Sequence, residues 1–130
     1  MIVGTGIDVI EITRVERALR RSGERFVRRV FAESEIGDCR SRRRSESHFA
    51  VRFAAKEAVM KALGTGWAGG VRWVDIETVS ESGKGPNNLS LRLHGRVAEL
   101  AAERNARPYL AVSCTRSHAM AFVLFENFDR

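Results

Sequence analysis

Runs of apolar residues with the two-residue period of a β-strand alternate along this chain with stretches whose apolar residues repeat every three or four positions. Strands are predicted over residues 2–7, 71–79, 89–93, 109–113 and 119–125, the last two as a hairpin, with a turn-rich stretch at 80–88. Helices are predicted over residues 12–21, 24–30 and 95–105, and from N-caps at Ser34 and Ser47. Antiparallel strands segregated around helices are typical of an α+β fold.

The predicted helix that follows Ser47 carries the clearest chemical signal. Steps of four residues lead from Phe49 to Phe53, Glu57 and Lys61, so two charged groups continue an apolar helix face. A solvent-facing Glu–Lys pair with this spacing is common and contributes only about 0.2–0.5 kcal/mol, which leaves a purely structural interpretation open. The segment ends in a Gly-Thr-Gly turn at 64–66, and an acid, a base and a glycine turn together suggest a phosphate site.

Asp8 interrupts an apolar, β-branched run near the start of the chain. A carboxylate in such a run must be solvated, paired or bound to a metal ion, so Asp8 is either a turn or N-cap residue or a ligand. Gly4 and Gly6 would let another backbone or a ligand approach closely. Together, Asp8 and Glu57 would offer two carboxylates to a hard cation such as Mg²⁺, and the Lys61 ammonium would neutralise phosphate oxygens.

Three blocks of this sequence resemble the holo-acyl-carrier-protein synthase family of phosphopantetheinyl transferases. They read GIDVIEITRVERAL, RFAAKEAVMKALGTG and VSCTRSHAMAFVLFE, and the first two have the family's order and spacing. The resemblance covers nearly all of the 130 residues. It implies one phosphopantetheinyl transferase domain over residues 1–130, with an antiparallel sheet packed against a long helix. It also implies a homotrimer whose active sites lie at subunit boundaries.

The resemblance assigns roles to individual residues. Asp8 and Glu57 are expected to bind Mg²⁺ together with the pyrophosphate of coenzyme A, and Lys61 is expected to contact phosphate. These three are the predicted catalytic residues. Arg52 is expected to face the adenosine phosphates. The coenzyme is also expected to run along the glycine turn, which consists of Gly64, Thr65 and Gly66.

The reaction that the resemblance implies uses coenzyme A as a substrate. A serine hydroxyl of an apo acyl carrier protein attacks the β-phosphate, receives 4'-phosphopantetheine and releases adenosine 3',5'-bisphosphate. Such chemistry belongs to fatty acid or polyketide biosynthesis. Positioning and charge neutralisation supply most of the catalysis of phosphoryl transfer, and two carboxylates, Mg²⁺ and a lysine can provide both. Glu57 and Asp8 remain alternatives for the general base.

The C-terminal block departs from the family pattern. Many relatives carry Ser-x-Ser/Thr-His before the last strand, whereas this chain reads Ser113, Cys114, Thr115 and Arg116. A histidine follows two residues later, at His118. Arg116 is expected to replace the family histidine as a phosphate contact of the coenzyme, because guanidinium is permanently charged and multidentate.

The basic charge is unevenly distributed. The net charge is +6, and its excess falls between Arg14 and Arg44, almost entirely as arginine. Arg14, Arg17 and Arg21 have helical spacing, which predicts a cationic helix face for an acidic partner. By resemblance they dock the acidic acyl carrier protein. The further arginines of residues 40–44 are predicted to form an exposed loop.

Two other functions stay open from the sequence. A basic nucleic-acid-binding module would explain the arginines, but no recognition motif or base-stacking pattern accompanies them. A relative that binds coenzyme A with weak transfer activity would explain the altered C-terminal block. No apolar stretch reaches membrane-spanning length and no signal peptide is evident, so no membrane contact and a cytoplasmic location are expected. Cys39 and Cys114 are expected to be reduced and at least partly buried.

Overall fold

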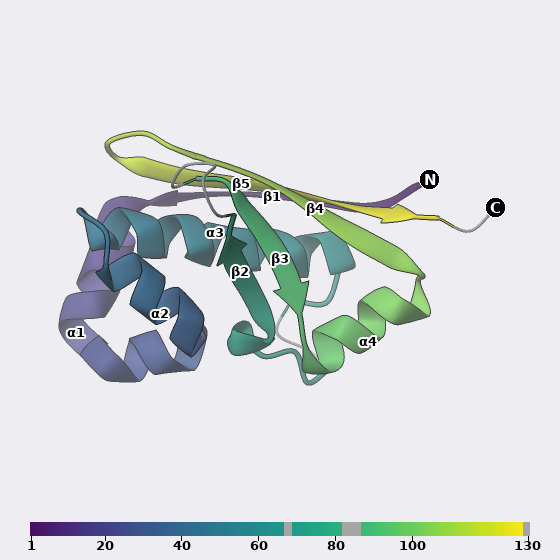
Figure 1. The fold of residues 1–130 in the computed structure, drawn as a ribbon, viewed down its shortest axis with the longest axis horizontal. Helices are drawn as coiled ribbons and strands as arrows, with labels where there is room; N and C mark the ends of the chain where they lie inside the picture. Colours follow the sequence, from purple (N-terminus) through teal and green to yellow (C-terminus); the bar gives the residue numbers. More distant parts are fainter. Residues whose placement is uncertain (67–68, 82–86, 129–130) are drawn as a thin grey trace.

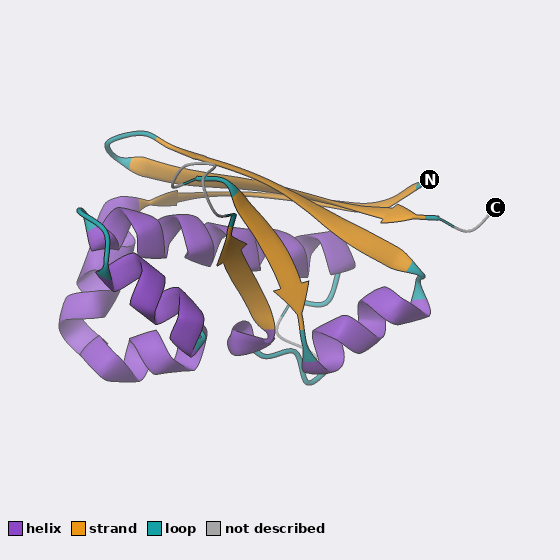
Figure 2. Ribbon diagram, viewed as in Figure 1, coloured by secondary structure: helices purple, strands orange, loops and turns teal. Residues whose placement is uncertain are grey.

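A three-stranded antiparallel sheet and one long helix form the centre of the computed structural model, which describes residues 1–66, 69–81 and 87–128 (Figure 1, Figure 2). The sheet has the order β1-β5-β4, with β1 at Ile2–Glu11, β5 at His118–Asn127 and β4 at Ala106–Cys114. A separate antiparallel pair consists of β2 (Ile76–Ser80) and β3 (Leu89–Leu93). The long helix, α3 (Ser45–Leu63), packs along one face of the three-stranded sheet.

The other helices lie on the side of α3 away from the three-stranded sheet (Figure 1). They are α1 (Ile12–Val30), α2 (Glu33–Arg40), α4 (Gly95–Glu103) and the 3₁₀ turn η1 (Trp73–Asp75). Because α3 is covered on several sides, its small residues Ala50, Ala54, Ala55 and Ala58 have no exposed surface. An α+β fold with a sheet against a long helix, as predicted, is therefore confirmed.

The packing of β1 on α3 explains two glycines of the first strand. A Cβ atom on Gly6 would lie 2.0 Å from the carbonyl oxygen of Ala58, and one on Gly4 would lie 2.3 Å from that of Ala62. No larger residue fits at this separation, so the predicted close approach is that of the α3 backbone. Since side chains of a strand alternate between faces, Asp8 points to the same side as Gly4 and Gly6.

The predicted helices are present, with different starts. The segments 12–21 and 24–30 are the two halves of α1, which is kinked where Gly23 leaves the helical conformation. Ser34 and Ser47 are not N-caps, because α2 begins after Ala32 and α3 begins after Arg44. Arg44 has the left-handed φ of 53°, an uncommon conformation for a residue with a side chain.

The predicted strands are also present, again with shifted ends. β1, β4 and β5 each extend beyond their predicted ranges, whereas the predicted strand 71–79 begins only at Ile76, after η1. β4 and β5 form the predicted hairpin. Of the predicted turn at 80–88, residues 82–86 lie outside the described part of the chain.

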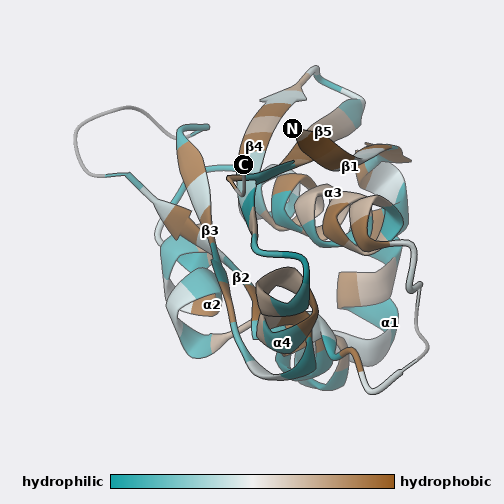
Figure 3. Ribbon diagram, turned by 90° about the vertical axis from the view of Figure 1, so that its right-hand side faces the viewer, coloured by the Kyte–Doolittle hydropathy of each residue, from teal (hydrophilic) through white to brown (hydrophobic). Residues whose placement is uncertain are grey.

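The outer face of the three-stranded sheet is apolar. Ile7 and Val9 on β1 and Phe122 on β5 are 62%, 56% and 41% exposed. Figure 3 shows the hydrophobic colour of β1. Among the described helices, none is long and apolar enough to span a membrane. Both cysteines are free thiols, as expected, but only Cys39 is buried; the expectation for Cys114 is wrong, because it lies exposed at the end of β4.

Candidate active site

The fold brings Asp8 of β1 next to Lys61 of α3. The Nζ atom of Lys61 lies 2.8 Å from Oδ1 of Asp8 and donates a second hydrogen bond to the carbonyl oxygen of Ile7 at 3.0 Å. The interpretation of Asp8 as a turn or N-cap residue is wrong, because Asp8 lies inside β1 and pairs with Ala121 of β5. Its carboxylate is paired with a cation, one of the solutions that its apolar surroundings require.

Glu57 belongs to the same group of charges. Burial raises the pKa of the Glu57 carboxyl, and the negative charge of Asp8 raises it further. The positive charges of Lys61 and Arg14 act in the opposite direction. Asp8, Arg14, Glu57 and Lys61 therefore form one interacting set, here called the charged cluster, at the junction of β1, α1 and α3.

The charged cluster fits a hard divalent cation. Neighbouring negative charge makes the proton more favourable on Glu57, and a divalent cation would relieve the same repulsion between Asp8 and Glu57. Within the described ranges, no three metal-binding side chains come together. Mg²⁺ commonly takes only one or two carboxylates and completes its shell with water and substrate phosphates, so a two-carboxylate site suits it.

The glycine turn follows directly on the helix that carries Glu57 and Lys61. Gly64 ends α3 in the left-handed conformation, with φ of 72°, and its N–H group donates to the carbonyl oxygen of Lys61 at 3.1 Å. Gly66 also has a positive φ, of 54°. The predicted turn of Gly64, Thr65 and Gly66 is thus placed at the Lys61 end of α3, with glycines where the backbone requires them.

A second polar site is a cavity of about 360 Å³ at the other end of α3. Three arginines line it, and we call it the arginine cavity. Its described lining consists of Arg43, Arg44, Ser47, His48, Val51, Asn87, Cys114, Thr115 and Arg116. Arg116, predicted as a phosphate contact, therefore lies beside two arginines that sequence reasoning assigned to an exposed loop. The sequence feature that could have identified Arg43 and Arg44 as cavity residues was their position directly before the long helix α3.

The charges around the arginine cavity favour an anion. Burial, and then the positive charges of Arg52 and Arg42, lower the pKa of His48, so its imidazole is neutral at pH 7. Guanidinium groups bind phosphate in a bidentate manner. The arginine cavity thus offers three permanent cations and a neutral imidazole to a phosphate-bearing ligand.

Arg52 does not line the arginine cavity in the described structure. Its side chain is 1% exposed and forms an ion pair with Asp38 and a hydrogen bond of 3.1 Å with Ser80. The contact of Arg52 with adenosine phosphates stays a prediction, and the contacts that the structure gives this side chain lie in the interior. A residue that is paired and buried in this way is expected to hold neighbouring residues of a site in place.

Lys56, next to Glu57 in the sequence, was missed as a structural residue. Its side chain is fully buried, and Nζ donates to Glu35 at 2.7 Å and to the carbonyl oxygen of Trp73 at 3.1 Å. Glu35 in turn accepts a hydrogen bond from the backbone N–H of Thr78 at 3.1 Å. Lys56 thus fixes α3 to α2 and β2, while the adjacent Glu57 belongs to the charged cluster.

The first half of α1 has the predicted amphipathic character. Ile12 and Val15 are buried, whereas Arg14, Arg17 and Arg21 are exposed. Arg14 differs from the other two arginines because its charge also acts on Glu57. The exposed arginines therefore lead from the surface of α1 to the charged cluster.

Comparison with known proteins assigns the family. Residues 4–123 match the model of the 4'-phosphopantetheinyl transferase superfamily. The holo-[acyl-carrier-protein] synthases of Koribacter versatilis and Vibrio cholerae are 43% and 46% identical to this chain, over 98% and 97% of it and over 100% and 98% of their own lengths. A crystal structure of the Bacillus anthracis holo-(acyl-carrier-protein) synthase in complex with CoA (3',5'-ADP) is 32% identical, covers 98% of both chains and has a TM-score of 0.78.

The chain belongs to the 4'-phosphopantetheinyl transferase superfamily, and within it to the holo-acyl-carrier-protein synthases. The resemblance inferred from the three sequence blocks is confirmed. The chain is therefore an enzyme, a phosphopantetheinyl transferase. This assignment favours the enzymatic interpretation of the arginines over a nucleic-acid-binding module.

Proposed function

We propose that this enzyme transfers 4'-phosphopantetheine from coenzyme A to a serine of an apo acyl carrier protein, in a Mg²⁺-dependent reaction that serves fatty acid or polyketide biosynthesis. The observation that carries the proposal is the charged cluster. In it, Asp8 lies against Lys61, which is 53 positions away in the sequence, and the charges of both act on Glu57, which is 49 positions from Asp8. The names of the relatives support the same donor and acceptor.

The proposed chemistry is displacement at the β-phosphorus of coenzyme A. The serine hydroxyl gives its proton to the general base, for which Glu57 and Asp8 remain alternatives, and its oxygen forms a bond to this phosphorus. The bond from phosphorus to the bridging oxygen breaks, and adenosine 3',5'-bisphosphate leaves with that oxygen. Bound Mg²⁺ would neutralise charge on the pyrophosphate. Asp8 and Glu57 would hold the cation, and Lys61, already close to Asp8, would place its ammonium against phosphate oxygens.

The arginine cavity is the proposed site for the adenosine bisphosphate end of coenzyme A. Arg43, Arg44 and Arg116 supply cations from the segment before α3 and from the β4–β5 turn. The Bacillus anthracis relative carries coenzyme A in its crystal structure, which supports the same substrate here. Arg116 would hold the phosphate at every physiological pH, whereas a histidine would do so only when protonated.

The exposed arginines of α1 are the proposed docking surface for the carrier protein. Arg14, Arg17 and Arg21 offer planar guanidinium groups to carboxylates of an acidic partner. Because Arg14 also acts on Glu57, a carrier docked on α1 would present its serine near the charged cluster. This placement couples partner recognition to the reacting groups.

We further propose a homotrimer with active sites at its subunit boundaries. The apolar outer face of the three-stranded sheet supports it, since Ile7, Val9 and Phe122 form a contiguous exposed surface with a shallow apolar hollow. Ile7 and Val9 flank Asp8 on the opposite side of β1. A neighbour packed on this face would therefore lie close to the charged cluster and can contribute part of the coenzyme site.

Product analysis tests the proposed reaction. Several apo acyl carrier proteins are incubated with the enzyme, coenzyme A and Mg²⁺, and adenosine 3',5'-bisphosphate is quantified by chromatography. One bisphosphate is expected per carrier modified, with no release after removal of Mg²⁺ by a chelator. Binding of coenzyme A without release, across all carriers, would instead identify a coenzyme-binding relative that lacks transfer activity.

A further inference from the structure

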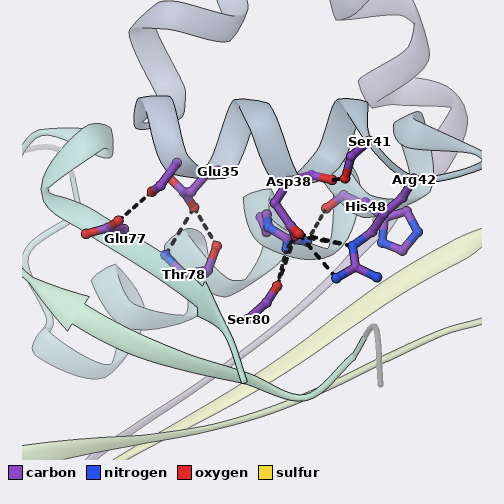
Figure 4. Close-up of polar contacts among 10 residues, drawn as sticks. Glu35, Asp38, Ser41, Arg42, His48, Glu77, Thr78 and Ser80 are labelled. Carbon is purple, nitrogen blue, oxygen red and sulfur yellow. Dashed lines mark hydrogen bonds and ion pairs between the residues drawn. The ribbon is translucent and has the colours of Figure 1, made fainter. Parts of the chain in front are cut away.

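Two polar anchors fasten α2 to α3 and β2, and Figure 4 shows how Glu35 reaches Thr78 and how Asp38 reaches Arg42 and Ser80. In the first anchor, Glu35 receives hydrogen bonds from Lys56 of α3 and from Thr78 of β2. In the second, the carboxylate of Asp38 joins Arg52 of α3 and Ser80 of β2, with 3.0 Å between Oδ2 and the Ser80 hydroxyl oxygen. The proposed function uses neither carboxylate.

The Asp38 anchor differs from the first because it reaches the segment before α3. Asp38 Oδ1 lies 3.2 Å from Nη2 of Arg42, and the backbone oxygen of Asp38 accepts a 2.7 Å hydrogen bond from the Ser41 hydroxyl. Arg52 also donates to the carbonyl oxygen of His48 at 3.4 Å. One carboxylate therefore ties together α2, the 41–44 segment, the first turns of α3 and β2.

These contacts involve the neighbours of residues that line the arginine cavity, and we call Asp38, Arg42 and Arg52 the wall of this cavity. Arg42 precedes the lining residues Arg43 and Arg44 in the sequence, and Arg52 follows the lining residue Val51. Burial is the largest single influence on the Asp38 carboxyl and raises its pKa, but hydrogen bonds from Arg42 and Ser80 and the positive charges of Arg52 and Arg42 together lower the pKa below its usual range. Asp38 is thus a carboxylate that pairs with two arginines, Arg42 and Arg52, neither of which belongs to the described lining of the cavity.

We propose that Asp38 is a positioning residue for the nucleotide end of coenzyme A, an inference that rests on the proposed function of the arginine cavity. By pairing with Arg42 and Arg52, Asp38 fixes which guanidinium groups are used inside the protein and which face the ligand. Without Asp38, Arg52 is a buried cation whose Nε already has no hydrogen-bond partner in the described structure. Such a charge is costly, so the wall would rearrange and the cavity arginines would lose their common orientation.

Isothermal titration with adenosine 3',5'-bisphosphate tests the inference. Asp38→Asn is expected to weaken binding of this probe about tenfold, the usual effect of losing a hydrogen bond between charged groups. Asp38→Glu, which keeps the charge, is expected to recover part of the loss. In steady-state assays Asp38→Asn should raise the KM for coenzyme A and leave the KM for the carrier protein unchanged, a split that general destabilisation does not produce.

Strand β2 provides a matched pair of milder variants in case Asp38→Asn does not fold. Ser80→Ala and Thr78→Val each remove one hydroxyl group, two residues apart, and each touches a different anchor. Both are expected to lower the thermal midpoint, but only Ser80→Ala should weaken binding of the probe. Equal or tighter binding by Asp38→Asn and Ser80→Ala overturns the inference and leaves the cavity's function intact. Failure of the wild-type enzyme to bind the probe overturns both.

Discussion

The ammonium of Lys61 lies 2.8 Å from the carboxylate of Asp8, which joins the middle of the first strand to the last turn of α3. The Lys61 ammonium is therefore paired with Asp8, whereas Glu57 is half-buried and lies within the influence of the Asp8 charge. The raised pKa of Glu57 follows from its burial and from Asp8. The stability of the enzyme is therefore expected to depend on the protonation of Glu57.

The contribution of Glu57 to the stability of the free enzyme is expected to fall as pH rises through the titration of this carboxyl. A carboxyl group whose pKa is raised by folding binds its proton more tightly in the folded state, so it stabilises the fold at low pH. That contribution is lost as pH rises from the ordinary value of 4.5 through the raised pKa. Glu57→Gln should flatten this part of the profile, which thermal unfolding at several pH values would measure.

Stabilisation by bound Mg²⁺ is expected to depend on pH in the opposite direction. Because the cation binds the ionised carboxylates, the stabilisation that it confers on the wild-type enzyme should grow as pH rises over the same window. Glu57→Gln should show little stabilisation by Mg²⁺ at any pH. An identical Mg²⁺-induced shift in both proteins would contradict the assignment of Glu57 as a ligand.

Charge reversal on α1 should separate the two substrates. Arg21→Glu places a negative charge on the proposed docking surface, so it is expected to raise the KM for the acidic carrier protein about tenfold with little change in the KM for coenzyme A. Arg14→Glu should also lower kcat, because Arg14 acts on Glu57. Arg72→Glu, at an exposed position directly before η1, is the matched reversal outside α1. Equal effects on both KM values would argue against docking at α1.

The outer face of the sheet should control assembly. Ile7→Asp is expected to dissociate the proposed trimer, since a charge cannot be buried without a partner there, and light scattering after size exclusion would report the mass. Transfer activity should fall when the trimer dissociates. A wild-type enzyme that is monomeric, or an Ile7→Asp variant that stays trimeric and active, would contradict the proposed interface.

Three residues of the charged cluster could be singled out because their signals are local, whereas Arg14 was predicted only as a docking residue. Asp8 interrupts a strand pattern, and Glu57 and Lys61 share one helix face, so each stands out within a few positions of sequence. The family resemblance then assigned Asp8 of the first segment and Glu57 and Lys61 of the helix to one site. The close approach predicted for Gly4 and Gly6 was also local, although the sequence did not say that α3 is the partner.

The anchors behind the sites could not be predicted in this way. Lys56 and Glu35 are 21 positions apart, and Arg52 and Asp38 are 14 apart, so no helical or strand period connects them. A charged residue within a helix is also expected at the surface, whereas α3 is enclosed and its polar residues must pair inside. Arg52 was expected at the ligand from the family resemblance, and its pairing with Asp38 in the interior could not be read from the sequence.

The start of β2 was misplaced for a related reason. Residues 71–75 alternate apolar and polar side chains much as a strand does, but they follow Gly69 and Gly70, which both have positive φ, and they turn through η1. The backbone oxygen of Asp75 instead accepts a hydrogen bond from the N–H of His94 at 2.8 Å. A contact with a segment 19 positions away thus decided the local structure.

The most direct measurement is the intact mass of an apo acyl carrier protein after incubation with the enzyme, coenzyme A and Mg²⁺. With the wild-type enzyme the carrier should gain one phosphopantetheine, and with Glu57→Gln it should gain none in the same time. Glu99→Gln, the same change on the exposed surface of α4, is the control and should match the wild type. Modification at the wild-type rate by Glu57→Gln, or no modification by the wild-type enzyme, would contradict the role assigned to the charged cluster.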